Sequence, residues 1–299
     1  MTQANQIYLI GVDGGGTGCR AVVADMHGVV LGYGQSGPAN VSTNTAQAVE
    51  NVMAAIREAW RVAQLPEAQM QAACCVLGLA GANNSDNVND FVRLLPFKTA
   101  YICDDRETNL RGAMGHGDGC LAAIGTGSFF CLRQQGHDTH IGGWGPAISD
   151  EGSGALLGRE ALRLCLHAEE GRLPHSDLTH SVFDGFSRSK ARLSEFAIHA
   201  TPGELAAYAK QIVVAAQGGD VNGQTLLMAA TRDVVACIQA TGFKGGLPLY
   251  LVGGLGAVYA ERLPVELREW IAAPKGGALD GALQIASDLI SEGGQANDD

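Results

Sequence analysis

Two glycine-rich turns have the residue types and spacing to bind phosphate. The first reads Asp13-Gly14-Gly15-Gly16-Thr17 and the second Gly125-Thr126-Gly127-Ser128, each between two short apolar runs. Glycines let successive backbone N–H groups converge on an anion, and a threonine hydroxyl adds a donor. Two such turns could hold a polyphosphate from both sides, although either one alone could be an ordinary glycine hairpin. Because no G-x-x-x-x-G-K-[ST] motif and no helix-opening G-x-G-x-x-G motif occurs, the sequence predicts neither a P-loop nor a dinucleotide site.

Acidic residues stand where a reacting group could use them. Asp104 and Asp105 come at the end of a predicted strand at residues 100–104. A carboxylate there can accept a hydroxyl proton, but Asp105 could instead cap a helix over residues 106–114. Adjacent strand residues point to opposite sides, so only one of the two acids should face a ligand. Asp150 is equally open, because it could bind a ligand or cap the next helix.

The elements that must position these residues alternate between strands and helices. Apolar runs and turn signals predict strands at residues 7–12, 19–25, 29–33, 74–79, 100–104, 120–124, 129–132 and 249–252. Apolar residues at helical spacing predict helices at residues 46–62, 86–95, 153–168, 205–216, 225–240 and 279–290. This alternation implies an α/β fold with helix-covered sheets. A strand, a glycine turn and a strand open each half, which indicates two domains, residues 1–115 and 116–299.

Composition and charge exclude several classes of protein. Hydrophobic residues make up 46% of the 299 residues and charged residues 17%, a globular composition. The formal charge of −11 disfavours nucleic acid and anionic membranes as partners. Neither a signal-peptide pattern nor a membrane-spanning apolar run is present, so we expect a cytoplasmic protein.

The cysteines and histidines predict no structural metal. The eight cysteines lack C-x-x-C spacing, and most lie in apolar segments, as in a reducing compartment. His137 and His140 are three residues apart in a predicted loop, but we see no third ligand near them.

Five motifs occur in one order along the chain: the first glycine turn, Asp105, the second glycine turn, Gly142-Gly143-Trp144-Gly145 and Asp150-Glu151-Gly152-Ser153. Together they resemble the N-acetylglucosamine kinases, and more widely the BadF/BadG/BcrA/BcrD-type ATPase group of the actin-like sugar kinase superfamily. The resemblance covers about residues 7–290. It implies an α/β fold of two actin-like (ribonuclease H-like) domains with a ligand cleft between them.

By this resemblance the protein uses ATP and Mg²⁺. Asp13 would hold Mg²⁺ through water, which that ion gives up reluctantly. The residues that would bind the phosphates are Gly14, Gly15, Gly16, Thr17, Gly125, Thr126 and Gly127. Gly253 and Gly254 would border the adenosine, and the loop Gly218-Gly219-Asp220 matches a second adenosine-bordering segment.

The resemblance also implies a sugar site. Asp105 would be the catalytic base and would contact the sugar, although relatives often carry asparagine where Asp104 stands. Relatives can carry a polar residue in place of Phe129, and Trp144 taken alone could belong to the core. The further residues that would contact the sugar are Asn40, Ser128, Phe129, Gly143, Trp144, Gly145 and Asp150.

The implied activity is ATP-dependent phosphorylation of an amino sugar, N-acetylglucosamine or glucosamine, at the 6-hydroxyl. Two other functions stay open. One is an ATPase activator of an acyl-CoA dehydratase or reductase, which needs accessible thiolates for an iron–sulfur cluster. The other is a non-catalytic sugar sensor. The expected partner is a small-molecule amino sugar, with no nucleic acid and no membrane, and a homodimer is left open.

Overall fold

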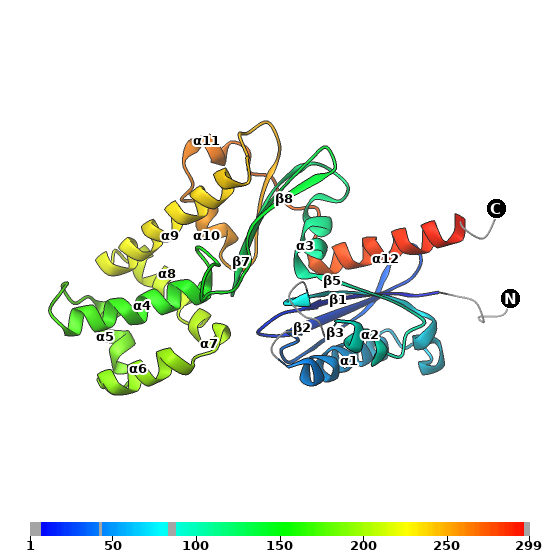
Figure 1. Cartoon of the computed structure of the whole chain (residues 1–299), viewed down its shortest axis with the longest axis horizontal. Coiled ribbons are helices and arrows are strands. Elements are labelled where there is room, and N and C mark those ends of the chain that lie inside the picture. The colour runs from blue at the N-terminus through cyan, green and yellow to red at the C-terminus, as the bar shows by residue number, and fades with distance from the viewer. Residues whose placement is uncertain (1–6, 42–43, 83–87, 296–299) are drawn as a thin grey trace. The chain divides into compact units, whose positions relative to one another are not determined.

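The computed structural model describes residues 7–41, 44–82 and 88–295 and divides the chain into two compact units (Figure 1). Unit 1 comprises residues 1–117 and 274–299, and unit 2 comprises residues 118–273. The prediction that residues 116–299 form one domain is therefore wrong at the C-terminus. The last helix belongs to unit 1, because its apolar face packs on the sheet of that unit.

The sheet of unit 1 has five strands in the order β3-β2-β1-β4-β5. β1, β2 and β3 are antiparallel, while β4 and β5 run parallel to β1. The strands are β1 (Leu9–Gly14), β2 (Cys19–Ala24), β3 (Val30–Ser36), β4 (Cys74–Leu79) and β5 (Thr99–Asp104).

Helices cover both faces of this sheet. Figure 1 shows α1 and α2 on one side and α3 and α12 on the other. Successive side chains of β1 point to opposite faces of the sheet. Ile10 packs in the core under α1, and Leu9 packs with Ala282 of α12. The helices of unit 1 are α1 (Thr45–Val62), η2 (Glu67–Ala72, a 3₁₀ helix), α2 (Val88–Arg93), α3 (Asp105–Met114) and α12 (Ala278–Gln295).

Glycines let α12 approach its neighbours closely. A Cβ on Gly11 of β1 would lie 3.0 Å from the Leu279 carbonyl oxygen. A Cβ on Gly112 of α3 would lie within 2 Å of the Gly277 carbonyl oxygen, a separation that no side chain tolerates. The crossing of α3 and α12 therefore depends on the absence of a side chain at Gly112.

The sheet of unit 2 has four strands in the order β8-β7-β6-β9. β6, β7 and β8 form an antiparallel meander, and β9 runs parallel to β6. The strands are β6 (Gly119–Ile124), β7 (Ser128–Gln134), β8 (His137–Gly142) and β9 (Leu249–Val252).

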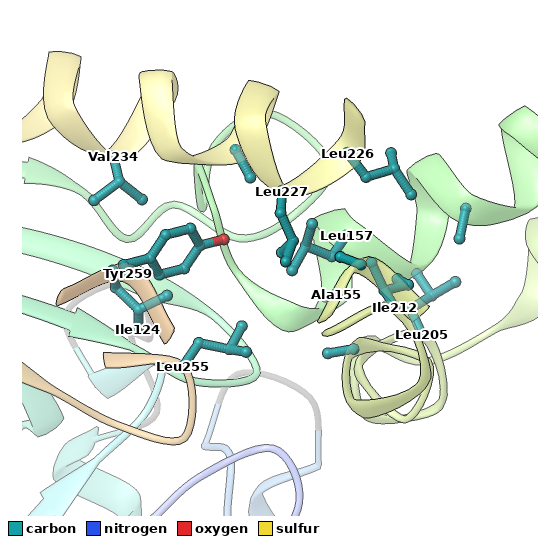
Figure 2. Close-up of a cluster of buried hydrophobic side chains, with 14 of the residues drawn as sticks. Ile124, Ala155, Leu157, Leu205, Ile212, Leu226, Leu227, Val234, Leu255 and Tyr259 are labelled. Atoms are coloured by element: carbon teal, nitrogen blue, oxygen red, sulfur yellow. The ribbon is translucent and has the colours of Figure 1, made fainter. Parts of the chain in front are cut away.

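The helices of unit 2 enclose one apolar core with one face of its sheet. Figure 2 shows Ile124 of β6, Leu157 of α4, Ile212 of α8, Leu227 of α9 and Tyr259 of α10 converging there. The helices are α4 (Gly154–Glu169), α5 (Asp177–Asp184), α6 (Lys190–His199), α7 (Pro202–Ala206), α8 (Ala209–Gln217), α9 (Val221–Ala240), α10 (Gly256–Ala260) and α11 (Val265–Arg268).

Most predicted elements are present, with some differences. β8 was predicted as a loop, and the single helix predicted at residues 205–216 is divided into α7 and α8. The predicted helix at residues 86–95 lies partly outside the described residues. Within residues 7–41, 44–82 and 88–295, no helix has the length and apolar character needed to cross a bilayer.

Candidate active site

The first glycine turn joins β1 to β2, at the edge of the unit 1 sheet where the parallel strands β1, β4 and β5 end. The Gly15 amide donates to the carbonyl three residues later at 2.9 Å and closes the turn. A Cβ on Gly14 would lie 2.6 Å from Cδ2 of Leu79 and 3.0 Å from Cβ of Ala39, so a side chain there would displace its neighbours. A Cβ on Gly16 would meet nothing within 4 Å, and Thr17 is exposed. A ligand can therefore approach the backbone at the tip of the turn.

Asp13 precedes this turn and forms an ion pair across the strands. Its side chain is 17% exposed, and its Oδ2 accepts from Nη2 of Arg20 at 2.5 Å. Carboxylate oxygens are the donors that Mg²⁺ takes, so the chemistry of Asp13 fits this ion. The Arg20 side chain is 65% exposed, and pairs of this kind contribute at most about 1 kcal/mol. Arg20, which the sequence analysis did not single out, can therefore withdraw from Asp13 at little cost.

The two adjacent acids have different roles at the start of α3. Asp104 is the last residue of β5 and the N-cap of α3, and its Oδ1 accepts the Arg106 amide at 2.9 Å and the Arg106 Nε at 2.6 Å. Asp105 is the first residue of the helix. The alternative that Asp105 caps this helix is therefore wrong. The argument that both acids lie on one strand is also wrong, because β5 ends at Asp104.

The position of Asp105 makes its carboxyl hard to ionise. Burial, followed by the negative charges of Asp104 and Asp13, raises the pKa of Asp105 to about 7, while the positive charge of Arg106 acts in the opposite direction. Because Asp13 and Asp104 act on it, the three carboxyls form one acidic group beside the first glycine turn. A general base works best when its pKa is near the working pH. Asp105 has that property.

Asn40 lies at the same edge of the unit 1 sheet. The amide of Ala39 donates to the Gly15 carbonyl at 2.9 Å, and the amide of Val41 donates to the Ala80 carbonyl at 3.2 Å. Asn40 is thus held between the first glycine turn and the end of β4. The structure brings together in unit 1 the predicted phosphate, metal, base and sugar residues of that half, at the carboxyl ends of parallel strands where α/β proteins bind ligands.

The second glycine turn joins β6 to β7 in unit 2. The Gly125 amide donates to the Gly127 carbonyl at 2.8 Å. Two amides from the start of α4 donate to the turn: Gly154 to the Gly125 carbonyl at 2.8 Å and Ala155 to the Thr126 carbonyl at 3.1 Å. The turn is thus fixed against a helix N-terminus, whose partial positive charge favours an anion nearby.

Asp150 joins the predicted sugar segment to this turn. It is 4% exposed, and its Oδ1 accepts the Gly145 amide at 3.0 Å. A Cβ on Gly127 would lie 2.7 Å from Oδ2 of Asp150, so the carboxylate lies directly against the second turn. Burial raises the pKa of Asp150 to about 6, and the Gly145 amide opposes this. The alternative that Asp150 caps α4 is wrong, because Ser153 is the cap.

The neighbouring sugar-site candidates differ in exposure. Trp144 is 60% exposed, so the alternative that it belongs to the core is wrong. Ser128 and Phe129 are buried, and the Ser128 hydroxyl donates to the Glu151 carbonyl at 2.8 Å. Gly143, in the segment between β8 and Asp150, has a φ of +79° that favours glycine. Trp144 and the backbone around it therefore present more surface to a ligand than Ser128 and Phe129 do.

The adenosine candidates separate into two places within unit 2. The Leu255 amide donates to the Ile124 carbonyl at 3.0 Å, which holds the Gly253-Gly254 turn beside the second glycine turn. A Cβ on Gly254 would meet nothing within 4 Å. The other candidate, Gly218-Gly219-Asp220, lies at the N-terminal end of α9, where Asp220 is the N-cap. That loop has a structural role, and the contacts that we describe do not join it to Gly253.

α7 is a neighbour of the second glycine turn that was not predicted from the sequence. A Cβ on Gly154 would lie 3.1 Å both from the Ala206 Cβ and from the Gly125 carbonyl oxygen. α7 thus packs on the first turn of α4. The sequence does carry a helix-start signal for α7. Thr201 and Glu204 have the spacing of a capping box, which they form in the structure, and Pro202 begins the helix.

Comparison with known proteins places the chain in a family. The model of the BadF/BadG/BcrA/BcrD ATPase family matches residues 10–289. The chain belongs to this family. One relative is the glucosamine kinase GspK of Vibrio cholerae serotype O1. It is 29% identical to this BadF/BadG/BcrA/BcrD-family protein over 280 residues, which are 93% of this chain and 95% of the relative.

Solved structures of other kinases share the fold. A Chromobacterium violaceum structure, assigned as an N-acetylglucosamine kinase, matches with a TM-score of 0.86 and 34% identity over 94% of this chain and 99% of the other. A ROK family glucokinase from Streptomyces griseus matches with a TM-score of 0.60 and 18% identity over 94% and 99% of the two chains. The predicted α/β fold of the actin-like sugar kinases is thereby confirmed.

Proposed function

We propose that this protein transfers the γ-phosphoryl group of ATP to the 6-hydroxyl of an amino sugar, N-acetylglucosamine or glucosamine. The observation that carries the proposal is Asp105, a carboxyl with a pKa near neutrality in the acidic group beside the first glycine turn. Family membership and the kinases named above support the choice of an amino-sugar kinase within the fold.

Asp105 is the general base of the proposed reaction. Its carboxylate accepts the proton of the sugar hydroxyl while the hydroxyl oxygen bonds to the γ-phosphorus and the bond to the leaving ADP oxygen breaks. Gly14 to Thr17 hold the phosphates through backbone amides and one hydroxyl, and Gly125 to Gly127 form the second clamp. Asp13 supplies an oxygen donor for Mg²⁺, which when bound neutralises charge on the phosphates.

The sugar is recognised by polar groups with fixed neighbours. Asn40 is positioned by backbone contacts on both sides, and Asp150 is positioned by the Gly145 amide. Amide and carboxylate groups pair with ring hydroxyls, and a buried partner left unpaired costs about 1–3 kcal/mol, which allows such a site to reject the wrong sugar. The Gly253-Gly254 turn accommodates the adenosine beside the second glycine turn.

The cysteines argue against the dehydratase-activator alternative. All eight are buried, and burial raises the pKa of seven of them: Cys19, Cys74, Cys75, Cys103, Cys120, Cys165 and Cys237. A cluster ligand must be a thiolate, and the raised pKa values keep these seven cysteines protonated. The remaining cysteine, Cys131, supplies one thiolate, whereas a cluster uses four. The sensor alternative gives no reason for a base whose pKa is near 7.

The test is an ADP-release assay with glucosamine, N-acetylglucosamine, glucose or no sugar, followed by ³¹P–¹H correlation NMR of the product. We expect turnover with at least one amino sugar and a phosphorus coupled to the C6 protons. The Asp105→Asn variant serves as the matched control. Equal use of glucose, phosphate on another hydroxyl, or ATP hydrolysis that ignores the sugar would each overturn the proposal.

A further inference from the structure

The β7–β8 hairpin brings together three side chains of metal-binding type. Cys131 of β7 and Asp138 and His140 of β8 each offer one ligand atom, and these three atoms lie within 4.8 Å of one another. The prediction that no third ligand lies near His137 and His140 is wrong for His140. Asp138 lies two residues before His140 on the same strand, and Cys131 lies opposite His140 on β7, so the group becomes visible only when the strand register is known.

Strand register explains why these residues meet and why His137 does not join them. Cys131 lies opposite His140, and Arg133 lies opposite Asp138. Because side chains alternate along a strand, these four residues share one face of the hairpin. His137 is an odd number of residues from His140 and belongs to the other face, where Ile141 packs against the core of unit 2.

The spacing matches a tetrahedral metal site. Bonds of about 2.3 Å to sulfur and 2.0–2.1 Å to nitrogen at a tetrahedral angle place the two ligand atoms about 3.6 Å apart. The Cys131 Sγ and the His140 Nε2 are 3.9 Å apart. A small adjustment of the exposed His140 ring closes the difference.

The surrounding charges suit a divalent cation. Arg133 donates to both carboxylate oxygens of Asp138, at 2.8 and 2.7 Å. A carboxylate oxygen has two lone-pair sites, so Asp138 can keep this partner and still bind a metal, with Arg133 orienting the ligand. Asp118 lies nearby and interacts with Arg133. With Cys131 as thiolate, the three negative groups and Arg133 sum to −2, which a divalent ion balances.

We propose that Cys131, Asp138 and His140 form a zinc site. Mixed sulfur, nitrogen and oxygen ligands select zinc over Mg²⁺ and Ca²⁺, which take oxygen ligands. Three protein ligands leave a fourth position for water. The ion would link β7 to β8. β7 begins at Ser128, directly after the second glycine turn, and β8 ends at Gly142, directly before the segment that carries Trp144.

The test is a titration of the full-length, reduced and metal-stripped protein with Co²⁺ and with Zn²⁺, in excess Mg²⁺ to occupy oxygen-donor sites. Co²⁺ at a thiolate-containing tetrahedral site absorbs strongly in the visible and gives a sulfur-to-metal band in the near ultraviolet. We expect one equivalent with both signals, and Zn²⁺ should displace the colour.

Variants separate this site from incidental binding. His140→Ala and Asp138→Asn should weaken zinc binding at least 10-fold, and Cys131→Ser should remove the near-ultraviolet band. His140→Ala changes an exposed residue, so a folding defect does not confuse the result. His137→Ala, on the same strand but the opposite face, is the matched control and should bind zinc as the wild type does. Equal zinc affinity of the wild type and His140→Ala, or a Co²⁺ spectrum without the thiolate band, would overturn the proposal.

Discussion

Replacing Asp105 with asparagine should stabilise the fold and strongly lower the proposed activity. The pKa of Asp105 is raised from 3.8 to about 7. Between these values the folded chain keeps a proton that the unfolded chain releases, so this group lowers the free energy of unfolding as the pH rises from about 4 to about 7. Above pH 7 the full penalty of the ionised carboxyl remains. Asparagine never ionises, so the variant avoids this penalty.

The size of the effect follows from the shift. About three pKa units correspond to roughly 4 kcal/mol at 1.36 kcal/mol per unit, and relaxation around the carboxyl makes this an upper limit. We expect a gain of at least about 1 kcal/mol at pH 8, which raises Tm by roughly 2–4 °C for a protein of this size class. At pH 5 the gain should be smaller, because wild-type Asp105 is then largely protonated when folded.

The assay is thermal unfolding of wild type and variant at pH 5 and pH 8, together with the ADP-release assay. Turnover should fall by about two to four powers of ten, the usual contribution of general-base catalysis. Asp104→Asn is the control: asparagine still caps α3, turnover should change far less, and the lost charge should move the pH midpoint of kcat/KM downward. A Tm of Asp105→Asn that is unchanged or lower at pH 8, or a gain equal at both pH values, would refute the reasoning.

Three further substitutions test other parts of the structure. Gly127→Ala places a Cβ 2.7 Å from Oδ2 of Asp150, so kcat/KM for the sugar should fall at least 10-fold in the ADP-release assay, and an unchanged value would contradict the placement of that carboxylate. Asn40→Ala should raise the KM for the sugar more than the KM for ATP in steady-state kinetics, and the reverse order would remove Asn40 from the sugar site. Gly112→Ala forces a Cβ against the Gly277 carbonyl and should lower the free energy of unfolding by about 1–3 kcal/mol in a denaturant titration, whereas a neutral result would mean that α12 can shift.

Local patterns predicted the strands and turns well, because their signals lie within a few residues. The strand at Leu249–Val252 was predicted with the observed bounds, and both glycine turns are where expected. β8 was missed because an exposed edge strand carries no alternating apolar pattern, and His137–Gly142 is mostly polar. Asp104, and not Asp105, caps α3. This difference depends on whether the helix begins one residue earlier or later, and sequence patterns do not locate helix ends to a single residue.

Long-range contacts account for the larger errors. The periodicity of residues 279–290 indicates a helix with an apolar face, but it does not say which sheet that face covers. The answer lies in contacts between Ala282 and Leu9, at opposite ends of the chain. The cluster of Cys131 and His140 is likewise visible only once the strand register is known.

The return of the chain to unit 1 at residue 274 has a consequence for biosynthesis. All of unit 2 is translated between the strands of unit 1 and the helix that completes them. At roughly 5–20 residues per second, the ribosome needs about 10–30 s to make that intervening stretch. During this time the side of the nascent sheet that carries Leu9, Val22 and Val76 has only α3 on it and lacks the apolar face of α12. Unit 2 can complete its fold first, while the earlier-made sheet remains a target for chaperones or for aggregation until the last helix leaves the exit tunnel.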